Sequence, residues 1–147
     1  MNDSINMVSA IEAVMQLSMI LMVGLYFTFS NTVMASLKGF ENGVDVMVEL
    51  NKVILNPLFM TCFIGSGISS AYLAVTGTGL VAISGAVFFI GTTLVTVIKN
   101  VPLNNKLLNA TEAISRQQVW REYLQKWVFW NHIRTASAVL SAFLLVV

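Results

Sequence analysis

The chain has 147 residues, of which 56% are hydrophobic and only 10% charged, and its mean hydropathy is +0.78. A soluble domain carries roughly a quarter charged residues, so this composition excludes an ordinary soluble protein and predicts one integral membrane domain over residues 1–147. The net charge of +1 argues against a nucleic-acid partner, and a single cysteine, Cys62, excludes a disulfide framework or a multi-cysteine metal site.

The first long apolar stretch predicts a membrane-spanning helix over residues 9–35. Residues 17–29 are almost continuously apolar, and a bilayer needs about 20 such residues to be crossed. The stretch ends with Ser30, Asn31 and Thr32, which bring polar groups to one boundary of the membrane.

A different pattern follows over residues 43–55 and predicts a short amphipathic helix. Asp45, Glu49 and Lys52 are spaced four and three residues apart, so they share one face of a helix. Apolar residues cover most of the remaining surface. We expect this helix to lie on the membrane surface or to pack on one end of a helix bundle.

Two further spans are predicted over residues 57–75 and 80–98. Asn56 is suited to cap the first of them, and Pro57 to stand in its first turn. Both contain several Gly, Ser and Ala residues, which let helix backbones approach closely inside a membrane. The four-residue turn at 76–79 makes these two spans antiparallel neighbours.

The region after the third span is polar. Pro102, with Asn100 and Asn104 on either side, predicts an interruption of the helix at the membrane boundary. A polar helical segment then leads without Pro or Gly into one long helix from Gln117 to the end of the chain. Its part over residues 127–147 is the fourth predicted span, and the expected fold is an all-α membrane bundle of four helices.

The basic residues predict the orientation of the bundle. The connections after spans one and three lie on one side of the membrane and carry seven of the eight Lys and Arg residues: Lys38, Lys52, Lys99, Lys106, Arg116, Arg121 and Lys126. Cytoplasmic loops are rich in Lys and Arg. We therefore expect both termini to be extracytoplasmic, and the protein to lie in a bacterial inner membrane.

The start of the last span carries the most unusual residues of the chain. A helix turns by about 100° per residue, which places one set of side chains on a single stripe: Trp120, Tyr123, Trp127, Trp130, Asn131 and Arg134. An Arg at this depth is costly unless it is paired or reaches the headgroups. Either Arg134 extends to lipid phosphates beside an interfacial Trp belt, or the stripe lines a pocket inside the bundle.

His132 lies off this stripe, and its role is open. A lone His can be a general base, a ligand of metal or haem, or a structural hydrogen-bonding group. No Cys or carboxylate stands at ligand spacing. We therefore expect no metal and no cofactor, and haem bound through His132 is the alternative.

At these residues the chain resembles a known family, the anthrone-oxygenase-like membrane proteins. The resemblance rests on F-S-N-T-V-M at 29–34, N-P-L-F at 56–59, N-V-P-L-N at 100–104 and W-V-F-W-N-H-I-R-T at 127–135. It implies a four-helix membrane bundle and gives the family's signature positions as Asn100, Asn104, Trp127, Trp130, Asn131, His132 and Arg134. Fungal members are linked to the oxidation of anthrones to anthraquinones.

Two functions of different classes follow. The first is an oxygenase without a cofactor, in which Trp127, Trp130 and Tyr123 stack on a lipophilic aromatic substrate and Asn31, Asn100 and Asn104 bind its oxygens. Asn131, His132 and Arg134 would carry the chemistry, with His132 removing a phenolic proton and Arg134 stabilising the resulting anion. The second is a non-catalytic membrane protein that binds lipid, haem or a partner subunit, with the small-residue faces mediating homo-oligomerisation.

Overall fold

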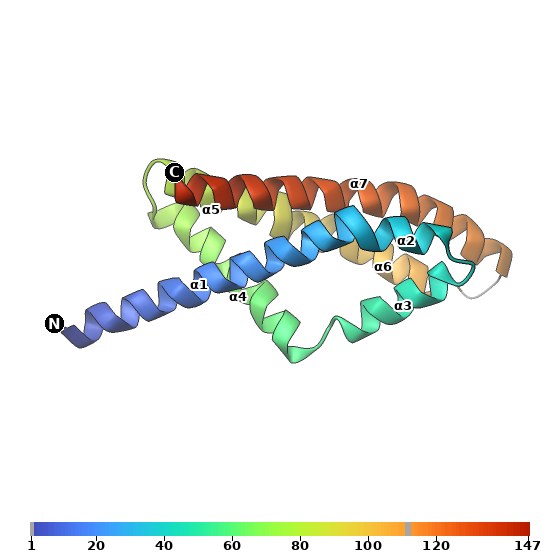
Figure 1. Cartoon of the computed structure of the whole chain (residues 1–147), viewed down its shortest axis with the longest axis horizontal. Helices are drawn as coiled ribbons and strands as arrows, with labels where there is room; N and C mark the ends of the chain where they lie inside the picture. The colour runs from blue at the N-terminus through green and yellow to red at the C-terminus, as the bar shows by residue number, and fades with distance from the viewer. Residues whose placement is uncertain (1, 111–112) are drawn as a thin grey trace.

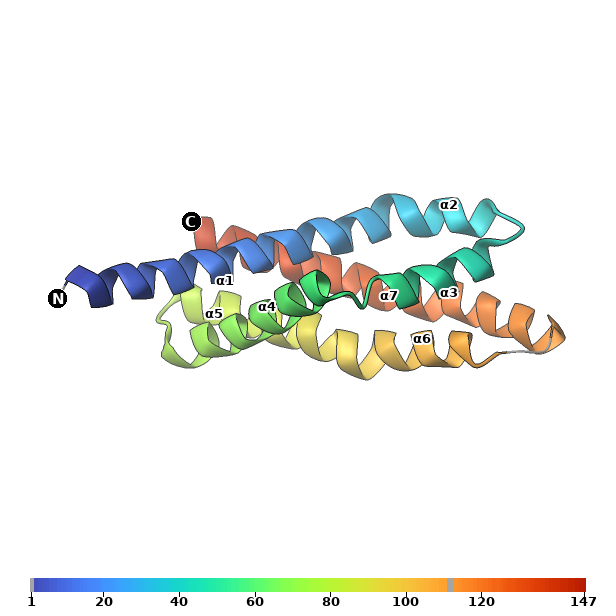
Figure 2. The same ribbon diagram turned by 90° about the horizontal axis from the view of Figure 1, so that it is seen from below.

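The protein is an elongated bundle of helices (Figures 1 and 2). The computed structural model describes the backbone of residues 2–110 and 113–147 and the side chains of residues 14–110 and 115–147. In order, the elements are α1 (Asn2–Thr28), the π-helical stretch η1 (Phe29–Val33), α2 (Met34–Gly39), α3 (Gly43–Val53), α4 (Pro57–Thr76), α5 (Leu80–Phe88), the π-helical stretches η2 (Phe89–Leu94) and η3 (Thr96–Asn100), α6 (Val101–Leu108) and α7 (Ala113–Val146).

Ten elements form four columns. The first runs through α1, η1 and α2, the second combines α3 with α4, the third runs from α5 to α6, and α7 is the fourth. The start of α1, the end of α7 and the α4–α5 turn lie at one end, and the α2–α3 connection, the end of α6 and the start of α7 lie at the other (Figure 2). The predicted all-α bundle, with its amphipathic helix and its long C-terminal helix, is confirmed.

Three described helices are long and apolar enough to cross a membrane, over Val14–Gly39, Pro57–Thr76 and Leu80–Leu108. The protein is therefore a membrane protein. The C-terminal part of α7 does not reach the same criterion, since it contains Asn131, His132 and Arg134 among its apolar residues. The fourth span over residues 127–147 stays a prediction.

The expected interruption at Pro102 is wrong. Helical structure continues from η3 directly into α6, and Pro102 stands at the second residue of α6. Proline lacks an amide hydrogen and its ring disturbs the preceding turn of an α-helix. Here that preceding turn is π-helical, so it is wider than an α-turn. The change of hydrogen-bonding pattern accommodates the ring without ending the helix.

The amphipathic helix α3 packs on the bundle end that carries the α2–α3 connection (Figure 1). Val44 and Met47 are buried from its apolar face, whereas Lys52 and Glu49 are exposed and paired with each other at 3.4 Å. The junction to α4 follows the predicted chemistry, because Asn56 Oδ1 accepts a hydrogen bond of 3.0 Å from the Phe59 amide.

The end of the bundle near the two termini is packed through small side chains. We call this the small-residue half and define it by Ser66, Ser70, Ser84, Gly85 and Ser141. Ser84 Oγ donates to the Ser141 carbonyl at 2.8 Å, and Ser141 Oγ donates to the Ser84 carbonyl at 3.0 Å. A Cβ atom on Gly85 would lie 2.5 Å from the Ala74 nitrogen. Helices α4 and α5 therefore approach each other closely through their backbones, and α5 and α7 are in contact through small serine side chains.

The opposite half is packed through large side chains. We call it the aromatic half and define it by Phe29, Met47, Trp120, Tyr123 and Trp127, which are all buried. The rings of Trp120, Tyr123 and Trp127 form a continuous stack along α7, with centroid separations of 5.6 Å and 5.4 Å. Phe29 of η1 lies 5.8 Å from Trp127 in a tilted arrangement. The helices of this half are therefore packed together through large side chains.

Candidate functional site

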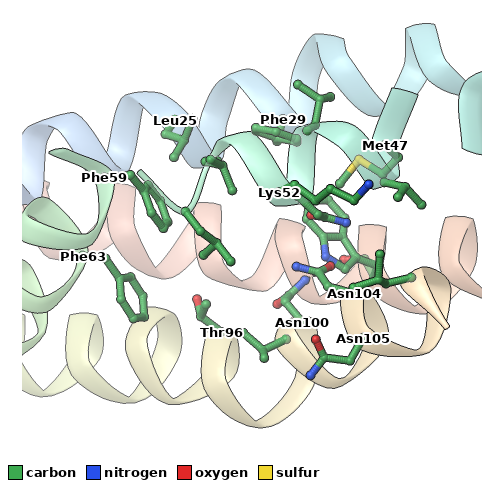
Figure 3. Close-up of a pocket in the computed structure, with 18 of the residues that line it drawn as sticks. Leu25, Phe29, Met47, Lys52, Phe59, Phe63, Thr96, Asn100, Asn104 and Asn105 are labelled. Atoms are coloured by element: carbon green, nitrogen blue, oxygen red, sulfur yellow. Dashed lines mark hydrogen bonds between the residues drawn. The ribbon is translucent and has the colours of Figure 1, made fainter. Parts of the chain in front are cut away.

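A cavity of about 260 Å³ lies in the aromatic half, between the first three columns and α7 (Figure 3). Its walls are mainly apolar, and aromatic side chains from α1, η1 and α4 contribute to them. The main apolar side chains of the wall are Leu25, Phe29, Met47, Ile54, Phe59 and Phe63. A cavity with such walls is suited to a lipophilic ligand with flat rings.

The cavity reaches the surface between the α3–α4 junction and α6. Leu55 on one side is 64% exposed, and Val101 and Leu108 on the other are 41% and 48% exposed. Lys52 and Asn105 complete this rim and are exposed too. The mouth is therefore mostly apolar and opens on the side of the bundle.

Arg134 contributes the charge at the inner wall of the cavity, and it is only 7% exposed. Its Nη1 donates to Thr96 Oγ1 at 3.1 Å, and its Nη2 donates to Asn131 Oδ1. The guanidinium carbon lies 4.5 Å from the centroid of the Tyr26 ring and 5.3 Å from that of Trp127. The two rings and the two neutral acceptors hold the cation in one orientation.

Asn131 fixes the position of the Arg134 guanidinium. Its Nδ2 donates to Ser30 Oγ at 2.7 Å and to the Tyr26 carbonyl at 3.4 Å, so its oxygen must face the guanidinium. Thr135 Oγ1 reaches the same Tyr26 carbonyl at 3.0 Å. These bonds tie α7 to the α1–η1 boundary. π-Helical stretches such as η1 are frequent at functional sites.

Asn100 connects η3 to α7 on the cavity wall. Its Nδ2 donates to the Trp127 carbonyl at 3.2 Å, which fixes the amide so that Oδ1 is the remaining polar atom. Asn100 Oδ1, Trp127 Nε1 and Arg134 Nε are buried and have no hydrogen-bond partner in the protein. All three residues line the cavity, and so does Asn51, whose buried Nδ2 also has no partner. Buried polar atoms without partners are rare in proteins, and their grouping around one cavity marks a binding site.

The end of the cavity nearest α3 is bounded by neutral polar groups. Tyr123 OH donates to Asn104 Oδ1 at 2.8 Å, and Asn104 lines the cavity. Burial raises the pKa of the Tyr123 hydroxyl above its ordinary value, and the Asn51 side chain and the Arg134 charge offset only part of this effect. Tyr123 is therefore a neutral hydrogen-bond donor that orients Asn104.

The structure distributes the predicted site residues over three environments. Four line the cavity: Asn100, Asn104, Trp127 and Arg134. Two are buried next to those residues without lining the cavity: Tyr123 and Asn131. Three lie elsewhere: Asn31 is exposed with its amide on Thr32, Trp130 packs under Lys99 with 5.1 Å between ammonium and ring, and His132 is exposed on the outer face of α7.

The structure also brings in residues that the sequence reasoning missed. Tyr26 and Thr96 contact Arg134, and Phe59 and Phe63 form the aromatic wall on α4. A signal was available for Thr96, because it stands four residues before Asn100 in an otherwise apolar stretch. No pattern distinguished Tyr26 or the two Phe residues from other apolar residues facing lipid.

The arrangement has the parts needed to stabilise negative charge on a bound ring system. The cationic side chain of Arg134 and the indole of Trp127 both line the cavity, whose walls are mainly apolar. Among the described residues no group of three or more His, Cys, Asp or Glu side chains is assembled.

Comparison with known proteins identifies the family of the chain. A search of curated proteins and a search of solved structures each returned no match. The family model described as anthrone oxygenase matches residues 45–144, from α3 almost to the end of α7. The match therefore includes Asn100, Trp127 and Arg134 and more than half of the chain, and the protein belongs to the anthrone oxygenase family.

Proposed function

We propose that the protein oxidises a lipophilic aromatic substrate, an anthrone or a related phenol, with molecular oxygen in this cavity. The observation that carries the proposal is the buried Arg134 at the inner wall of an aromatic-lined cavity, in a chain of the anthrone oxygenase family. The ring-lined wall provides contact area for a polycyclic substrate. Arg134 provides the charge that its anion requires.

The reaction balances without an added reductant. The methylene carbon of an anthrone loses two hydrogens and gains one oxygen atom as a carbonyl, and the second atom of O₂ leaves as water. Removal of one proton from the methylene first gives an enolate, which is electron-rich enough to reduce O₂. Stabilising this enolate is therefore the main task of the protein, and a redox cofactor is not required.

Each residue of the cavity has a defined part in this proposal. Phe59 and Trp127 contact the substrate rings, and Arg134 stabilises the enolate oxygen. Asn100 accepts from a substrate hydroxyl, because its Oδ1 is the unpartnered atom. Asn131 is a positioning residue, because it acts through Arg134. His132 has no part, since its side chain lies on the outer face of α7.

We infer that the substrate arrives through the membrane. The apolar rim residues Leu55, Val101 and Leu108 support lateral access from the lipid. The Lys-rich connections stand at the bundle end that contains the cavity, so the positive-inside rule assigns this end to the cytoplasmic side. The substrate would then come from the cytoplasmic leaflet, and both termini would be extracytoplasmic.

The proposal is tested with detergent-purified protein, anthrone and an oxygen electrode, with anthraquinone measured by chromatography. Anthrone also oxidises by itself, so the protein-free rate is subtracted. We expect protein-dependent uptake of one O₂ per anthraquinone formed. Oxygen uptake equal to the protein-free rate with anthrone and with hydroxylated anthrones would contradict an oxygenase and leave a binding protein for lipophilic aromatics.

A pair of threonines provides a matched control. Thr92 and Thr96 are both buried, and each hydroxyl donates to the carbonyl four residues earlier. Only Thr96 also accepts from Arg134. We expect Thr96→Val to lower the rate about tenfold through the lost hydrogen bond to a charged group, whereas Thr92→Val leaves the rate unchanged. Equal rates in the two variants would show that the hydrogen bond from Arg134 to Thr96 does not contribute to the reaction.

A further inference from the structure

The charge of Arg134 is not neutralised within the part of the chain that the structure describes. The four described ion pairs involve Lys52, Lys106, Arg116 and Lys126, and none includes Arg134. Its partners are the neutral oxygens of Thr96 and Asn131 and two ring faces. A buried cation is unfavourable unless an anion compensates it. The cavity beside it is the place where such an anion fits.

The unpartnered atoms specify what the anion looks like. Arg134 Nε and Trp127 Nε1 are both donors, and they suit an oxygen that carries negative charge. Asn100 Oδ1 is an acceptor, and it suits a neutral hydroxyl or amine. The three residues that carry these atoms line a cavity with mainly apolar walls, so the rest of the ligand is lipophilic.

Among the described residues that line the cavity there is no carboxylate or imidazole to take up a proton. Its ionisable lining residues are Tyr26, Lys52 and Arg134, and Lys52 stands exposed at the rim. A bound acid therefore gives its proton to water at the mouth. The positive charge of Arg134 favours the ionised form of any acid held next to it.

We propose that the cavity selects ionised lipophilic acids of the phenol and enol class, holding the charged oxygen on Arg134 and Trp127 and a neighbouring hydroxyl on Asn100. This inference rests on the proposed function only for the use of the same cavity. It concerns binding, and it adds that substrate ionisation is driven by Arg134 rather than by a protein base. Redox-inert phenols are therefore ligands as well.

The test uses 2-hydroxyanthraquinone, whose colour changes on ionisation and which already carries both carbonyl groups of an oxidised product. The detergent-purified full chain is titrated with this dye at a series of pH values, and the same series is recorded in protein-free detergent. We expect the ionisation midpoint of the bound dye to fall by at least one pH unit, which corresponds to about tenfold tighter binding of the anion. An unchanged or raised midpoint, or no binding, would overturn the proposal.

Variants separate a specific site from general partition into the micelle. Trp127→Phe removes one donor and keeps a ring, whereas Trp120→Phe makes the same change in a buried residue that does not line the cavity. We expect the midpoint shift to shrink in Trp127→Phe and to persist in Trp120→Phe. Asn131→Asp places a counter-charge next to Arg134 and is expected to abolish the shift. Equal shifts in all three variants would contradict the assigned contacts.

The result is independent of the oxygen-uptake assay. A lowered midpoint without anthrone oxidation would disprove the proposed function and leave the binding inference intact. Anthrone oxidation with an unshifted midpoint would support the oxygenase and disprove the selection of anions.

Discussion

The two halves of this bundle treat buried polar groups in opposite ways. In the small-residue half the hydroxyls of the four defining serines all have partners within the protein, as in the reciprocal pair of Ser84 and Ser141. In the aromatic half Asn100, Trp127 and Arg134 line a cavity and each has a buried polar atom without a partner in the protein. The first arrangement gives stability, and the second keeps binding capacity at the expense of stability. Substitutions in the two halves should therefore affect different measurements.

The largest effect is expected for Arg134→Leu and concerns activity. Loss of the cation removes the charge opposite the substrate anion, which should lower kcat by roughly 10²–10³-fold, as for other anion-stabilising groups. Stability should change little, because removing an uncompensated buried charge is favourable and offsets the hydrogen bonds that Thr96 and Asn131 lose. Thermal unfolding and oxygen uptake measured on the same sample check both parts. An Arg134→Leu variant with a clearly lower melting temperature but an unchanged rate of oxygen uptake would contradict the roles assigned to the two halves.

The next effect is expected for Gly85→Ala and concerns stability. The added Cβ would lie 2.5 Å from the Ala74 nitrogen and 2.6 Å from the Ser70 carbonyl oxygen, so α4 and α5 must separate. Overpacking of this kind costs about 1–3 kcal/mol. Gly24→Ala is the control, because no atom lies within 4 Å of its Cβ position. Equal melting temperatures in the two variants would show that the close approach of α4 and α5 does not limit stability.

A smaller effect is expected for the serine pair. Ser84→Ala and Ser141→Ala each remove one donor of the reciprocal contact. Once either serine has been replaced, replacing the other should lower the free energy of unfolding by a smaller amount. Coupling between such groups in membrane proteins averages about 0.6 kcal/mol. A double-mutant cycle on unfolding free energies measures it. Strict additivity of the two single changes would indicate that the two hydroxyls act independently.

The smallest effect is expected for Glu122, which pairs with Lys106 and Lys126 on the surface of the aromatic half. Hydrogen bonds from these two lysines lower the pKa of Glu122 from 4.5 to about 2. A carboxyl whose pKa is lowered by folding adds stability above the ordinary pKa, and this stability is lost as the pH falls through about 2. The melting difference between the wild type and Glu122→Gln should be small at neutral pH and vanish between pH 4.5 and 2. A difference that grows on acidification would have the wrong sign.

The sequence predicted the membrane bundle well because composition and apolar length decide it. The buried stripe of Trp120, Tyr123, Trp127 and Arg134 followed from helical spacing alone. The same spacing also placed Trp130 on the stripe. The buried face of α7, however, covers a narrower range of angles around the helix axis than residue spacing can distinguish. Trp130 lies at the edge of the stripe, under Lys99.

Other features depended on tertiary structure. The continuation of the helix through Pro102 depends on the π-helical turn of η3, which has no recognised sequence signal. Tyr26 became a neighbour of Arg134 only through the packing of α1 on α7. The exposure of His132 was already implied by its angle to Asn131, but the chemistry of imidazole made it an attractive candidate base.

The junction at Asn56 also has a kinetic consequence. Because α3 and α4 are separate helices joined by a short connection, the second column has a seam where the cavity meets the surface. Exposed side chains such as Leu55 and Leu108 border this seam, and exposed side chains change rotamer within picoseconds to nanoseconds. Ligand exchange therefore needs no separation of the four columns. Residence time in the cavity should be set by the contacts of the ligand itself rather than by the opening of a rigid bundle.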